Sequence, residues 1–528
     1  MLRCLVGALA FFAACGVALS QGESAAPSAI GDISALLEHV LSDPAKLAQL
    51  QAKYRAKPPR GGNGFSLARF HYERAQAAGE IGDSRGEIEA LRKAAALVRR
   101  TGGEEEAQYL QELASALARG GNFFEALAIC ERAFPIANPG RLVTLGSAAA
   151  AYYAAIGDAD RAHAAIARAE DGYARVRQLR SPLARSMSGF FRGVIHLGRG
   201  VILVADGGRG EAEAALRRSV QELGEERPRA SARASSGQIP SSQSPESHVQ
   251  MVAFWHDAAE LRLADLLIGL ERLDEAEAVL RRVLARLSAR FGPRHFNTAQ
   301  AFDSYSRLLY LRARFHEADE LARAAVQSYE KARVLPEAMP LARSRREWAR
   351  SLAAQQRWDE ALAAFEAMRT GLAVDSRSLK SFGAGDIDWA TALIATGKPG
   401  KAAAMLRSLI VRSDDPSGSH HLQTGMLRGM LGIALSRTGK RSEALHEIEA
   451  ALPALAGDES ADEERLRARE GRITRIVDAY IKLQIGTRAG EAGESAGVAA
   501  ASGAAPQLAS SVEPASATIS RSALNSSR

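Results

Sequence analysis

The sequence predicts an all-α protein, a right-handed superhelical α-solenoid built from helix–turn–helix repeats. Three observations support this fold class. Apolar residues recur at helical spacing along most of the 528 residues, few segments alternate as β-strands do, and small residues recur at nearly constant intervals. A repeat array extends its core along one axis, so a chain of this length does not need several separate domains.

The clearest repeat unit runs from Phe291 to Glu330, with a break near Arg314. Small residues recur at one position of each first helix: Ala114, Ala150, Gly200, Ala264, Ser306, Ala349, Ala390 and Gly432. Alanines recur at one position of each second helix: Ala126, Ala162, Ala212, Ala276, Ala318, Ala361, Ala402 and Ala444. The last five alanines are separated by 42, 43, 41 and 42 residues. Because helices approach closely only where facing side chains are small, these positions predict the contact inside each pair.

Composition divides the chain into seven segments. They are a signal peptide (1–20), a lead-in with a short helix (21–64), N-terminal repeats (65–224), a disordered insertion (225–248), C-terminal repeats (249–455), a closing helix (456–485) and a disordered tail (486–528). The insertion is predicted because Pro228, Pro240 and a serine-rich run lie among few apolar residues. In the closing helix, Ile473, Ile476 and Tyr480 share one face, as a cap on the exposed end of an array requires.

The N-terminus predicts export by a bacterial secretory route, to the periplasm or beyond. Arg3 precedes an apolar run from Leu5 to Val17, and Ala18-Leu19-Ser20 fits a cleavage site. Cys15 also ends a weak lipobox, so a lipoprotein is the alternative, and membrane attachment is expected only if Cys15 is lipidated. Without this leader Cys130 is the single cysteine, which excludes an intramolecular disulfide.

Charge patterning argues against nucleic acid as a partner. The chain has 68 Lys and Arg against 61 Asp and Glu, a formal net charge of +7. Acidic and basic residues alternate along the helices and do not form basic runs, so the excess indicates solvated helix faces.

Several inter-helix turns resemble those of the tetratricopeptide repeat (TPR) family. These turns are Gly121-Asn122-Phe123-Phe124-Glu125-Ala126, Gly157-Asp158-Ala159-Asp160-Arg161-Ala162 and Gln356-Arg357-Trp358-Asp359-Glu360-Ala361. The later period near 42, with Gly292-Pro293-x-His295-x-x-Thr298-Ala299, is similar to the longer repeats of kinesin light chains and their bacterial relatives. The resemblance covers about 65–455 and is strongest over 255–455. Its repeats also look like those that precede the caspase-like peptidase domain called CHAT.

The chemistry-bearing residues predict no enzyme, no cofactor and no metal. A CHAT domain needs a His–Cys pair, but no α/β domain follows residue 485, and Cys130 stands at an interior helix position typical of a core residue. His420 and His421 form a lone pair, whereas a structural zinc site needs four ligands. His295 belongs to a turn, where we expect a capping hydrogen bond. The motifs HExxH, GxxxxGK[ST] and GxSxG are absent.

The resemblance implies that the first helix of each pair lines a concave groove. In that register the inward residues are Arg262, Asp265, Asp303, Arg307, Tyr310, Arg343, Arg346 and Arg350. Arg343, Arg346 and Arg350 lie at i, i+3 and i+7, on one helical face. The planar guanidinium suits carboxylates, so these residues predict a binding site for an acidic segment of another protein. The alternative is a solvated face on which Glu347, Asp319 and Glu320 neutralise the arginines.

The sequence therefore predicts an exported, non-enzymatic scaffold that holds a partner segment in its groove. Two alternatives remain open. The chain can be a regulatory or recruitment partner of a separately encoded CHAT-type peptidase, or a lipid-anchored envelope component that assembles with itself.

Overall fold

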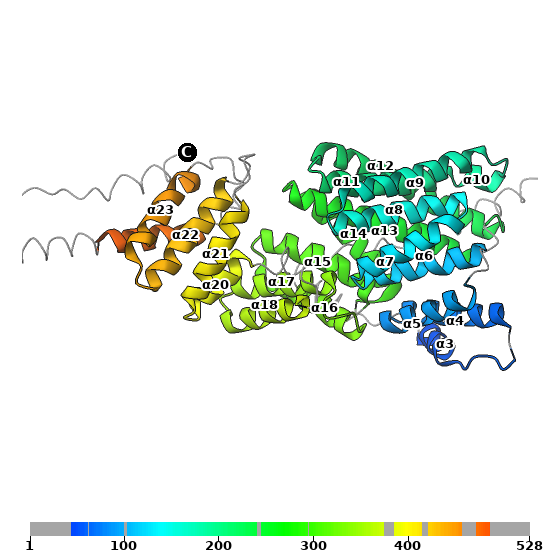
Figure 1. The fold of residues 1–528 in the computed structure, drawn as a ribbon, viewed down its shortest axis with the longest axis horizontal. Coiled ribbons are helices and arrows are strands. Elements are labelled where there is room, and N and C mark those ends of the chain that lie inside the picture. The colour runs from blue at the N-terminus through cyan, green and yellow to red at the C-terminus, as the bar shows by residue number, and fades with distance from the viewer. Residues whose placement is uncertain are drawn as a thin grey trace, which may run out of the picture.

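The computed structural model describes residues 44–485, apart from 62, 100–102, 240–243, 294, 374–384, 414–420 and 457–470. Within these ranges the secondary structure is helical and contains no β-strand, which confirms the all-α class (Figure 1). The expected signal peptide (1–20) and the expected tail (486–528) lie outside the described residues.

In the described part of the chain a single helix, α3 (Pro44–Arg55), precedes nine helix pairs. The pairs are α4 (Gly64–Glu80) with α5 (Ser84–Leu97), α6 (Glu104–Arg119) with α7 (Phe123–Ala133), α8 (Pro139–Ala155) with α9 (Ala159–Gln178), α11 (Ser188–Ala205) with α12 (Arg209–Ser235), α13 (Pro245–Gly269) with α14 (Leu273–Phe291), α15 (Phe296–Leu311) with α16 (Phe315–Lys331), α17 (Met339–Ala354) with α18 (Trp358–Leu372), α20 (Ile387–Ala395) with α21 (Pro399–Ser413), and α22 (His421–Arg437) with α23 (Arg441–Ala456). Two short helices, Phe134–Ile136 and α10 (Pro182–Ser186), join neighbouring pairs. Residues 471–485 form a last helix, called the closing helix below.

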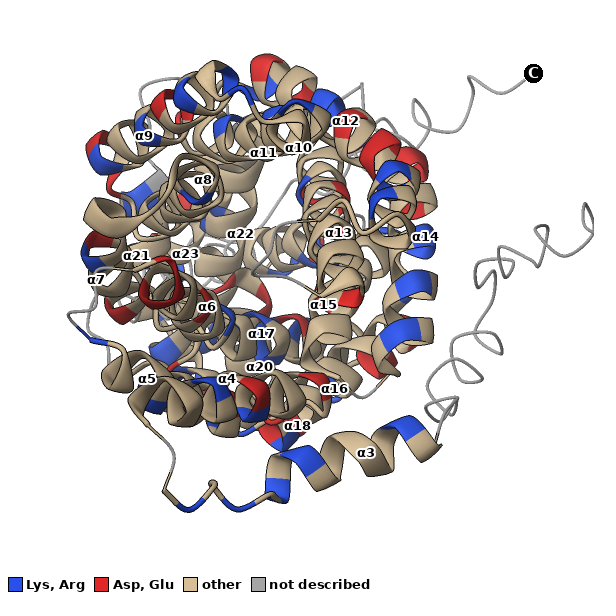
Figure 2. Cartoon of the chain, turned by 90° about the vertical axis from the view of Figure 1, so that its right-hand side faces the viewer, with Lys and Arg blue, Asp and Glu red and all other residues tan. Residues whose placement is uncertain are grey.

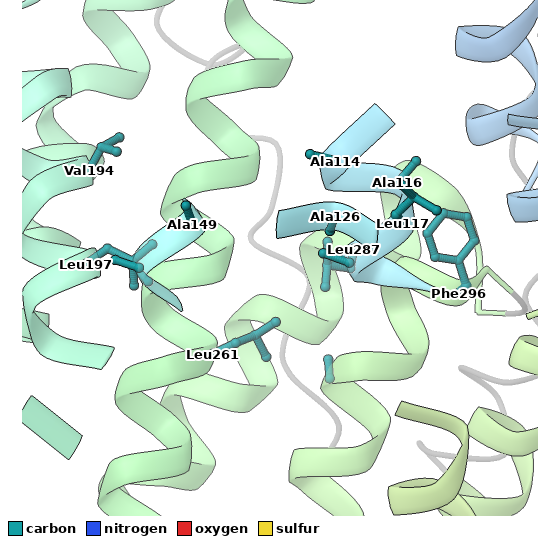
Figure 3. Packing of buried hydrophobic residues seen from close by; sticks show 14 of the residues in the cluster. Ala114, Ala116, Leu117, Ala126, Ala149, Val194, Leu197, Leu261, Leu287 and Phe296 are labelled. Atoms are coloured by element: carbon teal, nitrogen blue, oxygen red, sulfur yellow. The ribbon is translucent and has the colours of Figure 1, made fainter. Parts of the chain in front are cut away.

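Small residues bring the two helices of each pair together, as the sequence predicts. All the repeated alanines and their small partners on the first helices are buried. At Gly432 a Cβ would lie 2.4 Å from Ile448 Cγ1 and 2.8 Å from the Ala444 carbonyl oxygen, so α22 and α23 meet backbone to backbone. Figure 3 shows Ala114 of α6 and Ala126 of α7 among the buried side chains of the larger of two core clusters.

Each of these nine pairs turns through one residue in the left-handed region of φ. Glycine takes this position in six turns, for example Gly121 (φ 81°) and Gly157 (φ 78°), because it lacks the Cβ that opposes positive φ. Glu271, Ala313 and Gln356 take it in the α13–α14, α15–α16 and α17–α18 turns. The turns are therefore alike in geometry although their sequences differ.

The insertion predicted over 225–248 is corrected by the structure. Helix α12 continues through Pro228 to Ser235, and α13 begins at Pro245; residues 240–243 lie outside the described residues. A buried polar network holds this stretch: Arg233 pairs with Glu226 at 2.9 Å and donates to the Ser186 carbonyl oxygen at 3.0 Å. The segment is folded although it is poor in apolar residues, and buried, hydrogen-bonded charged groups occupy part of its inward face.

The solenoid closes on itself after about one superhelical turn. His295 Nε2, before α15, donates to the Gly79 carbonyl oxygen of α4 at 2.8 Å, while its Nδ1 accepts from Asn297 N. Arg333, after α16, pairs at 2.7 Å with Asp83, which caps α5. In Figure 2 α4 and α5 accordingly lie on the same side of the ring as α16 and α18. The capping role expected for His295 is confirmed. Its imidazole also joins distant repeats through the hydrogen bond to Gly79.

Helix α11 is the one described helix that is long and apolar enough to cross a membrane. Its buried residues pack against α8, α9, α12 and α13, as those of a core helix in a folded array do.

Candidate peptide-binding groove

The first helices of successive pairs form one continuous stack. Helices α13, α15, α17, α20 and α22 each contact the next in this series. Their shared face carries the residues that the sequence predicts to line the groove. The structure divides these residues into two clusters that differ in charge and in what they contact.

The first group, called the Tyr310 cluster, consists of Tyr310, Glu347, Arg350, Asp386, Asp388 and, from the closing helix, Arg472. The Tyr310 hydroxyl donates to Asp388 Oδ2 at 2.7 Å, and the Arg350 guanidinium lies 4.3 Å from the centre of the Tyr310 ring. Arg350 also pairs with Glu347 at 3.1 Å. Charge-assisted hydrogen bonds and a cation–π contact therefore satisfy Arg350 within the chain.

Arg472 completes the Tyr310 cluster from a distant part of the sequence. Its guanidinium pairs with Asp388 Oδ1 and donates to the Tyr310 hydroxyl at 2.8 Å. The two arginines hold the pKa of Asp388 below its usual range, although burial acts in the opposite direction. Burial raises the pKa of the neighbouring Asp386, and the charge of Asp388 adds to this effect. The cluster is thus a nearly neutral ion-pair network only while Arg472 is present.

The second group, called the Arg343 cluster, consists of Arg262, Asp265, Asp303, Arg307 and Arg343. Arg262 pairs with Asp265 at 3.4 Å, and Arg307 donates to the Asp265 backbone carbonyl oxygen at 3.1 Å. Asp303 accepts a hydrogen bond from Ser344 Oγ.

Arg343 differs from the other arginines of the groove. It is exposed, and no carboxylate among the described residues lies within ion-pair distance of it. Desolvation by the groove walls lowers the pKa of Arg343, and the positive charge of Arg262 lowers it further. A guanidinium that is partly desolvated and beside a like charge is stabilised by any anion that enters.

Asp303 does not neutralise this positive charge at neutral pH. Burial raises the pKa of Asp303 to about 8, so that its carboxyl is mostly protonated at pH 7. Three guanidinium groups then meet two nearby carboxyl groups, Asp265 inside the cluster and Glu347 of the Tyr310 cluster, which interacts with Arg307. The Arg343 cluster is therefore an electropositive site that suits a carboxylate.

The structure thus treats the predicted groove residues in two ways. Tyr310, Arg346 and Arg350 contact acidic residues of the chain itself, with Arg346 lying 3.2 Å from Glu347. At these positions the alternative of neutralised arginines applies. Glu347, which was expected from the sequence, and Asp388, which was not, are the neutralising acids. Asp319 instead pairs with Arg357 at 2.7 Å and Glu320 lies 3.8 Å from His316. Arg262, Asp303, Arg307 and Arg343 remain candidates for binding a partner.

Sequence reasoning missed three residues of the groove, Asp386, Asp388 and Arg472. One signal was present, because Asp388 stands two residues before the small Ala390, as Glu347 stands two residues before Ala349. Both acids are buried, and both pair with Arg350 of the same face. Arg472 had no such signal, because the closing helix does not belong to the repeat register.

One cluster within the described ranges has metal-ligand chemistry. His256, Asp257 and Glu260 of α13 bring their ligand atoms within 4.8 Å of one another. Arg286 lies among them, pairing with Asp257 at 2.9 Å and with Glu260. Burial and the Arg286 charge lower the pKa of His256 to about 4. The cluster is a buried ion-pair network whose cation is already an arginine side chain.

Cys130 has the environment of a core residue. It is fully buried in α7, and burial raises the pKa of its thiol to about 12. A nucleophilic cysteine needs a low pKa and access to solvent, so this site has the opposite properties. His420 lies outside the described residues, and its neighbour His421 begins α22.

The stacked helix pairs and their inner face define an α-solenoid with a groove. Residues 256–331 match the family model of the tetratricopeptide repeat. The chain therefore carries tetratricopeptide repeats in this region, and such repeats generally mediate protein–protein interaction through an extended concave surface.

Solved structures of helical-repeat proteins are similar over part of the chain. Nearly identical TPR-like repeats attributed to a kinesin light chain of Podosopora anserina are 21% identical, covering 38% of this chain and 96% of theirs, with a TM-score of 0.30. BtubC (BKLC) from P. vanneervenii is 14% identical, covering 47% and 94%, with a TM-score of 0.32. The P58(IPK) TPR domain is 12% identical, covering 78% and 98%, with a TM-score of 0.22. No curated protein matches the chain. These values are too low to transfer any function.

Proposed function

We propose that this chain is an exported scaffold whose groove binds an acidic segment of another protein at the Arg343 cluster. The observation that carries the proposal is Arg343 itself. It is exposed on the inner helix α17, has no carboxylate partner in the described part of the chain, and faces a second guanidinium, that of Arg262. Arg346 and Arg350 of the same helix pair with Glu347, so Arg343 differs from them in having its guanidinium available to a ligand.

An extended or helical segment bearing glutamate or aspartate fits this site by charge. A guanidinium donates two parallel hydrogen bonds to one carboxylate, which gives both attraction and orientation. The inner walls partly desolvate Arg343, and such an interaction is stronger there than on an open surface. The scaffold therefore needs neither cofactor nor covalent chemistry to hold its partner.

The proposal is tested by titrating the mature protein into fluorescein-labelled octaglutamate and measuring fluorescence anisotropy at fixed salt. We expect Arg343→Gln to weaken binding about tenfold, because a hydrogen bond to a charged group contributes about 1.5–3 kcal/mol. The matched control is Arg323→Gln, which removes an exposed arginine from the outer helix α16. Equal affinity in the two variants, with circular dichroism showing unchanged helicity, would contradict the proposal.

A photo-crosslinking amino acid in place of Arg262 identifies the natural partner in intact cells. Mass spectrometry of the adduct names the protein that lies at the groove, including a separately encoded CHAT-type peptidase if that is the partner. Loss of the same adduct on adding Arg343→Gln ties the captured protein to the Arg343 cluster.

Export is proposed from the leader sequence, which lies outside the described residues. The mass of the mature N-terminus distinguishes the two forms of export. Cleavage after Ser20 leaves Gln21 as the first residue, whereas lipoprotein processing leaves a diacylglycerol on Cys15.

A further inference from the structure

The closing helix reaches across the groove from the end of the array. At its C-terminal end, the Leu483 carbonyl oxygen accepts a hydrogen bond from Arg441 of α23. In its middle, Ile476 is fully buried against Gly429 of α22. At its N-terminal end, Arg472 enters the Tyr310 cluster between α15 and α20. The helix therefore occupies the inner face as well as covering the last pair.

Gly429 creates the seat for Ile476. A Cβ at position 429 would lie 2.5 Å from Ile476 Cδ1, so any larger residue in α22 would fill the space that the isoleucine takes. Arg472 and Ile476 are four residues apart and therefore share one face of the closing helix. Arg472 contacts the Tyr310 cluster, and Ile476 packs on Gly429. The groove thus recognises a helix by one arginine and one apolar side chain.

The closing helix buries fewer side chains fully than the helices beneath it, and Ala479, Tyr480 and Leu483 pack against the core only partly buried. Ile476 is its single fully buried residue among the fifteen that the structure describes, whereas α15 and α13 bury most of their inward side chains. Elements with few buried apolar contacts open at low free-energy cost and exchange amide hydrogens early.

Removing the closing helix would leave a site with the opposite charge to the Arg343 cluster. Arg346 and Arg350 would then face three carboxylates, those of Glu347, Asp386 and Asp388, and the buried Tyr310 hydroxyl would lose Arg472. With two guanidinium groups against three carboxylates, a further guanidinium from a bound helix would stabilise the site.

We propose that this half of the groove is a second docking surface, for an amphipathic helix that carries an arginine four residues before an isoleucine, and that the closing helix occupies it as an exchangeable ligand. The inference rests on the proposed function in that the same groove is the binding surface. It names a partner chemistry that differs from the acidic segment at the Arg343 cluster. Helix-in-groove binding reuses the contacts that the chain makes with itself.

The test uses a fluorescein-labelled peptide with the sequence of residues 471–485 and the full mature chain. Ile476→Glu in the protein should release its own helix, and Arg472 with it, while Tyr310, Asp388 and Gly429 keep their sequence and stay available to the peptide. We expect the peptide to bind this variant about tenfold more tightly than wild type, because the attached helix lowers the fraction of open sites. The control Lys482→Glu, on the exposed side of the same helix, should behave as wild type.

Four further outcomes decide whether the site recognises this helix. A peptide with Arg472→Gln, or a protein with Gly429→Leu added to Ile476→Glu, should lose binding if the arginine and the glycine seat define the site. The proposal is overturned if wild type and Ile476→Glu bind the peptide equally, or if Ile476→Glu binds none while hydrogen exchange shows its closing helix released. The octaglutamate titration depends on Arg343 and not on Ile476, so failure of either proposal is seen separately.

Discussion

Asp303 gives the groove a dependence on pH at the scale of one residue. Its pKa is raised to about 8 by burial, from an ordinary value of 3.8. Between these values the folded protein keeps a proton that the unfolded chain releases. The contribution of Asp303 to stability is therefore fully present below about pH 4 and is lost as pH rises through 8.

We expect Asp303→Asn to remove this loss. In urea unfolding, the free energy of unfolding of wild type should be lower at pH 9 than at pH 6, and this decrease should be smaller in Asp303→Asn. The control Asp359→Asn, at an exposed position, should show the same decrease as wild type. Octaglutamate binding should also weaken above pH 8 in wild type and in Asp359→Asn but not in Asp303→Asn, because ionised Asp303 adds a negative charge near Arg343. Parallel pH profiles for all three proteins would exclude Asp303 as the titrating group.

The residues of the groove show how far sequence reasoning reaches. Position within a repeat predicts that Arg343 and Arg350 share the inner face, because that follows from helical spacing alone. It does not predict that Arg350 is paired and Arg343 is free. Glu347, named from the sequence, pairs with Arg350 at 3.1 Å, but the other partners in this network were missed, since Asp388 and Arg472 contact Tyr310 at sequence separations of 78 and 162 residues.

Helix pairs are the elements most completely predictable from the sequence. Small residues at fixed intervals identify the contacts inside each pair, since close approach of two helices leaves no room for larger side chains. The C-terminal half of α12 was not predictable in this way. Arg233 and Glu226 are buried there as an ion pair, and a search for apolar periodicity counts both residues as exposed.

At the scale of the element, Gly432→Ala should destabilise the protein. Its Cβ would lie 2.4 Å from Ile448 Cγ1 and 2.8 Å from a backbone oxygen, and overpacking of this kind costs about 1–3 kcal/mol. Gly400→Ala in α21 is the matched control, because nothing lies within 4 Å of its Cβ and alanine favours the helix by about 0.5–1 kcal/mol. Thermal unfolding should therefore shift in opposite directions, and equal shifts would disprove the close contact.

At the scale of the whole molecule, the closure of the ring depends on Gly121. A Cβ there would lie 2.8 Å from Ala338 Cα and from Met339 N, at the start of α17. Gly157 has almost the same positive φ, 78° against 81°, but nothing lies within 4 Å of its Cβ. Substitutions at Gly121 and Gly157 therefore distinguish two effects. Backbone strain is common to both sites, whereas only Gly121 makes a contact across the superhelical turn.

We expect Gly121→Ala to open the ring and Gly157→Ala to leave it closed. Both variants should lose about 1–2 kcal/mol of stability from left-handed strain. Small-angle X-ray scattering should show a larger radius of gyration for Gly121→Ala alone, with faster hydrogen exchange in α4 and α5. Identical scattering curves for the two variants would show that the contact at Ala338 does not hold the ring.

The contacts that close this ring also bear on how the chain folds. In a linear stack each repeat touches only its neighbours, and its units can melt nearly one by one. Here His295 meets Gly79 across 216 residues and Arg333 meets Asp83 across 250. Such distant pairs form only after a long loop has closed, so their entropic cost precedes their stabilisation. The first and sixth helix pairs are therefore linked in one cooperative unit, and joining them is a late step of folding.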